Sequence, residues 1–135
     1  MKKQIFINLP VADLTKAKTF YEAIGFVNNP QFTDNTAACM VLSEEIFVML
    51  LTHDKFSGFT QKQIADTNKT VAVINSLSCI NNDEVNKVAD KALAAGGKQT
   101  HEPMDYGFMY QRSFADLDGH HWEVFYMDLS KFPNQ

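Results

Sequence analysis

The residues best suited to chemistry follow a turn near the end of the chain, in the run Asp116-Leu117-Asp118-Gly119-His120-His121-Trp122-Glu123-Val124-Phe125. Asp118-Gly119 predicts a hairpin, because glycine readily adopts the positive φ of a tight turn. In the strand that follows, His121, Glu123 and Phe125 share one face. Burying a carboxylate among aromatic residues is costly unless the carboxylate has a partner. Glu123 is therefore either a hydrogen-bonded structural residue or a metal ligand or general base.

Composition limits the classes of protein to consider. A chain of 135 residues is long enough for one domain with a proper core. The net charge of −4 and the pI near 5.5 argue against nucleic-acid binding, which needs a basic surface. Cys39 and Cys79 lie in apolar runs and predict buried reduced thiols, as in a cytoplasmic protein. No apolar run is long enough to span a membrane, and the start of the chain lacks a signal-peptide pattern.

The first part of the chain predicts a βαβββ unit over residues 4–53. A strand at 5–9 should end at Pro10, because proline cannot donate to a strand ladder. Asp13 is a good N-cap for an amphipathic helix that Gly25 ends. Three further strands are predicted at 26–32, 37–42 and 46–51.

Residues 54–69 predict a polar linker loop with one helical turn at 61–65. Phe56 and Phe59 are unusual in such a loop, and they predict either a lid over a pocket or a dimer contact.

The second part, residues 70–127, repeats the plan of the first. A strand at 70–79 precedes a helix that Asp83 caps and Gly96-Gly97 ends. The remaining strands are predicted at 98–101, 108–115 and 121–127. The repeat of cap, apolar stripe and stop signal indicates a duplicated βαβββ unit.

The duplicated pattern resembles the vicinal oxygen chelate superfamily, which includes glyoxalase I, extradiol dioxygenases, and bleomycin- and fosfomycin-resistance proteins. The resemblance spans the chain and is closest to uncharacterised glyoxalase-like members. It implies a single α+β domain in which the two βαβββ units form a cupped, eight-stranded mixed sheet around one pocket, and a homodimer. The residues that carry it are Asn8 to Leu14, Phe20-Tyr21, Gly25-Phe26, Ala94 to Gly97, and Asp116 to Glu123.

In metal-dependent members of this superfamily, four ligands come from the first and last strands of the two units. The resemblance places these positions at Phe6, Met49 (or Phe47), Ile74 and Glu123. Glu123 alone is of a type that binds the divalent ions concerned, so a divalent metal is disfavoured and no other cofactor is predicted. A rescued site would combine Glu123 with His121, Asn8 and His101, since two histidines and a carboxylate can bind non-haem iron.

The predicted inward residues indicate a small-molecule pocket, mostly apolar with a few polar groups. The alternative is that these residues simply fill a core. Arg112 could also pair with Glu123 if their strands are neighbours and their faces agree. The predicted pocket residues are Phe6, Asn8, Phe47, Met49, Ile74, His121, Glu123 and Phe125.

The favoured function is binding of a small, partly apolar molecule without a metal, by a cytoplasmic homodimer that binds neither nucleic acid nor membrane. The alternative is a metal-dependent lyase or dioxygenase of the glyoxalase type. In that alternative, Glu123 is a metal ligand and the best candidate for a catalytic residue.

Overall fold

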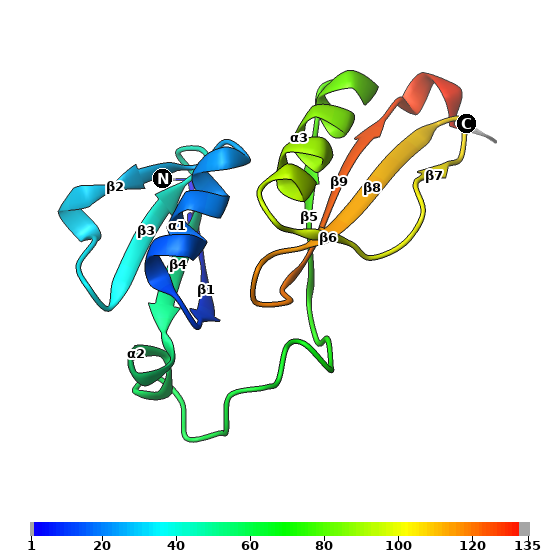
Figure 1. Cartoon of the computed structure of the whole chain (residues 1–135). Coiled ribbons are helices and arrows are strands. Elements are labelled where there is room, and N and C mark those ends of the chain that lie inside the picture. The colour runs from blue at the N-terminus through cyan, green and yellow to red at the C-terminus, as the bar shows by residue number, and fades with distance from the viewer. Residues whose placement is uncertain (1, 133–135) are drawn as a thin grey trace. The chain divides into compact units, whose positions relative to one another are not determined.

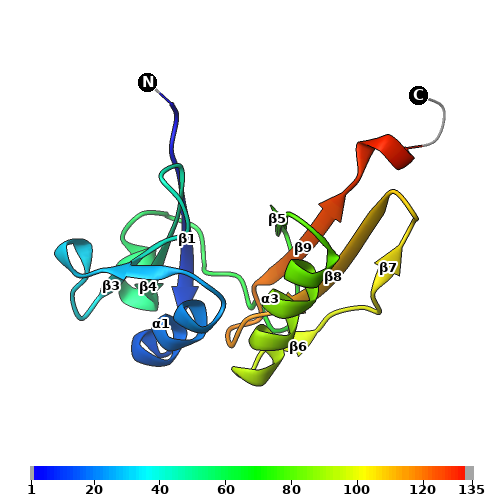
Figure 2. The same cartoon turned by 90° about the horizontal axis from the view of Figure 1, so that it is seen from above.

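The computed structural model describes residues 2–132, and the chain divides into two compact units, Met1–Thr70 and Val71–Gln135. Both units combine a sheet with a helix packed on one of its faces, so the predicted α+β class is confirmed. Figures 1 and 2 show the elements of each unit from two directions. None of the helices within residues 2–132 has the length and apolar character that crossing a membrane requires.

The first unit has a four-stranded sheet in the order β1-β4-β3-β2. β1 runs parallel to β4, and the other neighbouring strands are antiparallel. Helix α1 packs on one face of this sheet, against the buried residues Met40, Val48 and Leu50. Its elements are β1 (Ile5–Val11), α1 (Leu14–Ala23), β2 (Val27–Asn29), a 3-10 helix (Pro30–Phe32), β3 (Ala37–Val41), β4 (Ile46–Thr52) and α2 (His53–Ser57).

The second unit has a five-stranded sheet whose main order, β5-β9-β8-β6, matches that of the first unit. Its first and last long strands, β5 and β9, are again parallel, so the predicted duplication of a βαβββ unit is confirmed. Its elements are β5 (Ile74–Ser78), α3 (Asn82–Ala94), β6 (Lys98–Gln99), β7 (Met104–Asp105), β8 (Met109–Ala115), β9 (His121–Met127) and a 3-10 helix (Leu129–Lys131). Strand β7 pairs with β8 and was not predicted. With it, the described residues form one strand more than the eight that were expected.

Helix α3 lies alongside β8 and β9 (Figures 1 and 2). Its apolar stripe is buried, and so are the residues that the two strands turn toward it. On the strands these residues are Phe114, Trp122 and Val124, all almost fully buried. Because side chains alternate along a strand, the neighbours of these residues lie on the opposite, helix-free face of the sheet.

The predicted helix signals in the first unit are confirmed. The Asp13 side chain accepts a hydrogen bond from the Lys16 amide, as an N-cap does, and Gly25 follows the helix with a φ of 111°. Strand β1 does not end at Pro10 as predicted but continues to Val11. It is an edge strand, where a residue without an N–H is tolerated.

Several other predicted features were wrong, among them the start of the strand predicted at 70–79, which begins at Ile74. The strand predicted at 26–32 is shorter, because Pro30 begins a 3-10 helix that Asn29 caps. The cap of α3 is Asn81 rather than Asp83, and the Glu84 carboxylate accepts from the Ile80 amide. The helical turn predicted at 61–65 is absent, and the preceding residues form α2 instead.

The linker between the two units includes Phe59, whose side chain is 69% exposed. The Lys55 ammonium lies 5.8 Å from the centre of the Phe59 ring, which partly accounts for this position. Phe56 is half-buried in α2. The roles suggested for these two residues, a lid or a dimer contact, stay predictions.

Candidate functional site

The helix-free face of the second sheet carries Glu123 and several other polar residues. Strand pairing places Ser76 and Ser113 directly on either side of Glu123, on β5 and β8. His121 and Phe125, at the alternate positions of β9, share this face with Glu123. This register places His121, Glu123 and Phe125 on one face of β9, as predicted.

Glu123 is held by two neighbours. The Ser76 hydroxyl donates a 2.7 Å hydrogen bond to Glu123 Oε1. The second carboxylate oxygen, Oε2, lies 4.0 Å from Nε2 of His101, which is too long for a hydrogen bond. The side chains of Glu123 and His101 are 22% and 32% exposed, so both are partly desolvated yet reachable by a solute.

A hydrogen bond made by the other ring nitrogen of His101, Nδ1, fixes the orientation of the imidazole. Nδ1 lies 2.7 Å from the backbone carbonyl oxygen of Glu102. A carbonyl oxygen can only accept, so Nδ1 carries the proton of that hydrogen bond. In the neutral imidazole Nε2 is then an acceptor, and it faces the carboxylate of Glu123.

Several polar residues of this face were not among the predicted site residues. The Thr100 hydroxyl donates to the buried Ser113 hydroxyl at 2.6 Å, and the Gln111 amide donates to the Met104 sulfur at 3.4 Å. The sequence alone shows that Gln111 and Ser113 share one face of β8. Their position beside Glu123 depends on strand pairing, which the sequence does not state.

The turn before β9 fixes where that strand begins. The buried Asp116 carboxylate accepts hydrogen bonds of 2.9 Å from the amides of Asp118 and His120. Gly119 has a φ of 89°, so the predicted hairpin turn is confirmed. His120 is buried beside this turn rather than exposed in it.

The pairing of Arg112 with Glu123, which the sequence left open, does not form. Their strands are neighbours, but Arg112 lies opposite Val124 and points to the face that α3 covers. There its guanidinium donates to Asp90 at 2.8 Å and to Asn86 at 3.2 Å. Arg112 therefore links α3 to the sheet. The neighbours of the Glu123 carboxylate are Ser76 and His101 instead.

In the first unit, the face away from α1 carries the other four predicted site residues. Phe6 and Phe47 stack with ring centres 4.4 Å apart, and Asn8 lies opposite Met49. The Asn8 amide donates to the Phe6 backbone carbonyl at 3.4 Å. This face is mainly apolar. Whether these four residues and those of the second unit line one pocket stays a prediction.

The two thiols differ in their surroundings. Cys39 lies beside Met49 in the first sheet, and burial raises the pKa of its thiol. Cys79 is half-buried rather than buried, and it follows β5. Both are free thiols.

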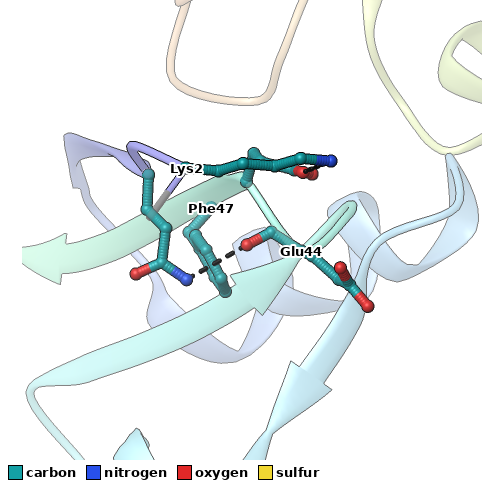
Figure 3. A pocket seen from close by; sticks show the side chains of 5 residues that line it. Lys2, Glu44 and Phe47 are labelled. Atoms are coloured by element: carbon teal, nitrogen blue, oxygen red, sulfur yellow. Dashed lines mark hydrogen bonds and ion pairs between the residues drawn. The ribbon is translucent and has the colours of Figure 1, made fainter.

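A surface pocket of about 450 Å³ opens beside Phe47 (Figure 3). Lys2, Gln4, Glu44, Glu45 and Phe47 line it. The Gln4 amide donates to the Glu44 carbonyl at 3.1 Å, and the Lys2 ammonium lies 3.3 Å from the Glu45 carboxylate. The Lys2–Glu45 ion pair is a surface pair and contributes no reactive group. The pocket makes one side of Phe47 accessible from the surface.

The residues present do not fit the divalent-metal site that the resemblance implies. Strand pairing places Ser76, not Ile74, opposite Glu123, and a serine hydroxyl that donates to the carboxylate is no replacement for a histidine ligand. Between Lys2 and Phe132, no three His, Cys, Asp or Glu side chains gather closely enough to hold a metal ion. The rescued site would need His121 and Asn8 as well as His101 and Glu123. Of these residues, His101 and Glu123 lie in contact within the second unit.

Comparison with known proteins agrees with this fold. Residues 3–43 match the family model described as bleomycin resistance protein-like N-terminal. The hypothetical protein SA1046 from S. aureus is 31% identical, covers 93% of this chain and 95% of its own, and superposes with a TM-score of 0.77.

More distant solved structures share the fold. A glyoxalase/bleomycin resistance protein/dioxygenase family enzyme from Burkholderia phytofirmans PsJN is 14% identical over 93% of this chain and 99% of its own, with a TM-score of 0.76. The fosfomycin resistance protein FosX from Mesorhizobium loti is 12% identical over 96% of both chains, with a TM-score of 0.69. No curated protein sequence matches the chain. With its duplicated βαβββ units, the chain shares the fold of glyoxalase-, bleomycin-resistance- and dioxygenase-like proteins, and its first unit matches the bleomycin-resistance-like family model.

Proposed function

We propose that the protein binds a small, partly apolar molecule at the helix-free face of its second sheet, and that it needs no metal ion to do so. The observation that carries this proposal is the arrangement of Glu123. One carboxylate oxygen is held by Ser76, and the other is directed toward His101 without a hydrogen bond between them. Such a carboxylate has capacity left for a ligand.

The surroundings of Glu123 suit a ligand that is polar at one end and apolar at the other. Phe125 and Ile74 lie on the same face, and Ile74 is 52% exposed. An apolar surface with a few polar groups that fix orientation is the usual composition of a small-molecule site. The stacked Phe6 and Phe47 offer a further apolar surface on the first unit, where part of the predicted pocket lies.

The first experiment is a ligand screen on protein kept in excess EDTA, with the unfolding temperature as the readout and titration calorimetry for the hits. The names of the similar proteins make bleomycin and fosfomycin sensible first probes, beside a library of small amphipathic molecules. Glu123→Gln should abolish binding of the hits because it removes the charge and keeps the shape. Glu102→Gln is the matched control, since it removes an exposed charge next to His101.

Hits that bind the wild type and the Glu102→Gln variant but not Glu123→Gln support the proposal. Hits that bind Glu123→Gln as tightly as the wild type would show that the site lies elsewhere. A screen in which no molecule binds in EDTA, although molecules bind after a metal is added, would also overturn it.

The second candidate function is a metal-dependent lyase or dioxygenase in which Glu123 is a ligand. The proximity of His101 to Glu123 favours it, because these are two ligand types on one face. Elemental analysis of protein purified without chelator separates the two candidates. We expect well under one equivalent of metal, whereas stoichiometric Ni, Zn, Mn or Fe would favour the second function.

We further propose that the protein is a homodimer of the cytoplasm. The resemblance to the superfamily supports the dimer, and the two free thiols agree with a reducing compartment. Light scattering coupled to size-exclusion chromatography tests the assembly: a mass near 15.3 kDa would show a monomer, and twice that mass a dimer.

A further inference from the structure

The gap between His101 and Glu123 contains two hydrogen-bond acceptors that face each other. Glu123 Oε2 is a carboxylate oxygen, and its partner oxygen already accepts from Ser76. His101 Nε2 is an acceptor in the neutral ring, because Nδ1 is engaged with the Glu102 carbonyl. The two acceptors are 4.0 Å apart, so neither satisfies the other.

This separation suits one ligand nitrogen that donates to both acceptors. A nitrogen about 2.9 Å from each would make an angle of about 90° between them, near the angle between two N–H bonds of an ammonium group. A hydroxyl group has a single proton and can satisfy only one of the two acceptors. A carboxylate has no proton at all and would be repelled by Glu123.

The other groups on this face leave the charge of Glu123 uncompensated within hydrogen-bond range. The helix-free positions of β5 carry Ile74 and two serines, and those of β8 carry no charged residue. Lys98 is opposite Ala115 at the far edge of the sheet and is exposed. His121 is two positions from Glu123 on the same face of β9.

We infer that the site selects ligands with a primary amine, whose ammonium group donates to Glu123 Oε2 and to His101 Nε2. The amine should be attached to a short apolar group that can lie against Phe125 and Ile74. This inference rests on the proposed function and names its ligand class. Ser76 is a positioning residue, because it holds one oxygen of Glu123 and so aims the other at the ligand.

The test compares three probes of nearly equal shape at pH 8 in EDTA: 2-phenylethylamine, 2-phenylethanol and phenylacetate. Binding is followed by the amide shifts of ¹⁵N-labelled full-length protein, which give an affinity and the residues affected. The amine should bind at least ten times more tightly than the alcohol, since a charge-assisted hydrogen bond is about twice as strong as a neutral one. Phenylacetate should not bind. The largest shifts should occur at Ser76, His101 and Glu123.

Variants show whether the amine uses this gap. Glu123→Gln should lower the affinity for the amine at least tenfold and leave the alcohol nearly unchanged, whereas Glu102→Gln should change neither more than twofold. If Glu123→Gln does not fold, His101→Ala tests the same gap. His101 is outside the strands, so the variant should fold, and it should weaken amine binding severalfold.

Equal affinity for the amine and the alcohol would overturn the inference. So would the absence of amine binding, or amine binding that survives both Glu123→Gln and His101→Ala. A molecule from the screen that has no amine but loses its affinity in Glu123→Gln would overturn the inference and leave the proposed function standing. Screen hits that all ignore Glu123→Gln would overturn the proposed function itself.

Discussion

The Ser76 hydroxyl donates a 2.7 Å hydrogen bond to Oε1 of Glu123, although 47 positions separate the two residues in the chain. The bond exists because β5 and β9 are parallel neighbours in register. It determines which carboxylate oxygen is free to meet a ligand. Ser76 is thus the residue through which the first strand of the second unit shapes the candidate site.

Ser76→Ala should weaken amine binding severalfold with little loss of stability. The removed hydrogen bond is charge-assisted, but Ser76 is exposed, so the free energy of unfolding should fall by less than about 1 kcal/mol. Amide-shift titration and chemical denaturation measure the two effects. Ser78→Ala, on the same face of the same strand, is the control and should affect neither quantity. A loss of stability without any loss of binding would contradict the role given to Ser76.

Arg112→Ala should destabilise the protein without changing ligand binding. The variant loses hydrogen bonds to Asn86 and Asp90 and the packing of the arginine stem, a loss of about 1–2 kcal/mol. Chemical denaturation measures the change. Lys87→Ala, an exposed position on the same helix, should stay within about 0.5 kcal/mol of the wild type. Reduced ligand affinity in a folded Arg112→Ala protein would mean that this side chain reaches the site after all.

Asp116→Ala should cost about 2–3 kcal/mol, because it removes the acceptor of the buried His120 amide and of the part-buried Asp118 amide. Asp105→Ala is the matched control. Its carboxylate also accepts from an amide two residues on, that of Gly107, but in an exposed turn, so the cost should be about 0.5 kcal/mol. Equal unfolding curves for the two variants would show that the turn before β9 is not the constraint described.

Cys79 should react slowly with iodoacetamide at pH 8. Burial raises the pKa of its thiol to about 11 from an ordinary 9.0, and the nearby Glu84 carboxylate adds to the rise. Because the folded protein favours the neutral thiol, this contribution to stability is present below about pH 9 and is lost as the pH rises through about 11. Peptide mapping by mass spectrometry should show alkylation accelerating toward pH 11, and acceleration at pH 8 in Glu84→Gln. Alkylation at pH 8 as fast as in the unfolded chain would refute this.

Local signals in the sequence were enough for most of the fold. The Asp13 cap, Gly25 and the turn at Asp118-Gly119 all lie where their chemistry predicted. The cap of α3 was misplaced because Asn81 and Asp83 are both capping types. The Glu three positions after Asn81 was the available signal that favours Asn81.

The candidate site was less predictable, because it depends on which residues lie opposite each other. The resemblance placed Ile74 at the ligand position of the first strand of this unit, whereas strand pairing places Ser76 opposite Glu123. Two positions along a strand leave the face unchanged, so alternation could not separate these residues. Likewise, the sequence could not show that Arg112 turns toward α3, since either face of β8 was compatible with its pattern.

The most direct test of metal-independent binding at Glu123 is a calorimetric titration of the best ligand from the screen into the full-length protein, in excess EDTA and again with added Mn²⁺ or Zn²⁺. We expect the same dissociation constant within a factor of two in all three conditions, and loss of binding in Glu123→Gln. Binding that disappears in EDTA and returns with the metal would contradict it.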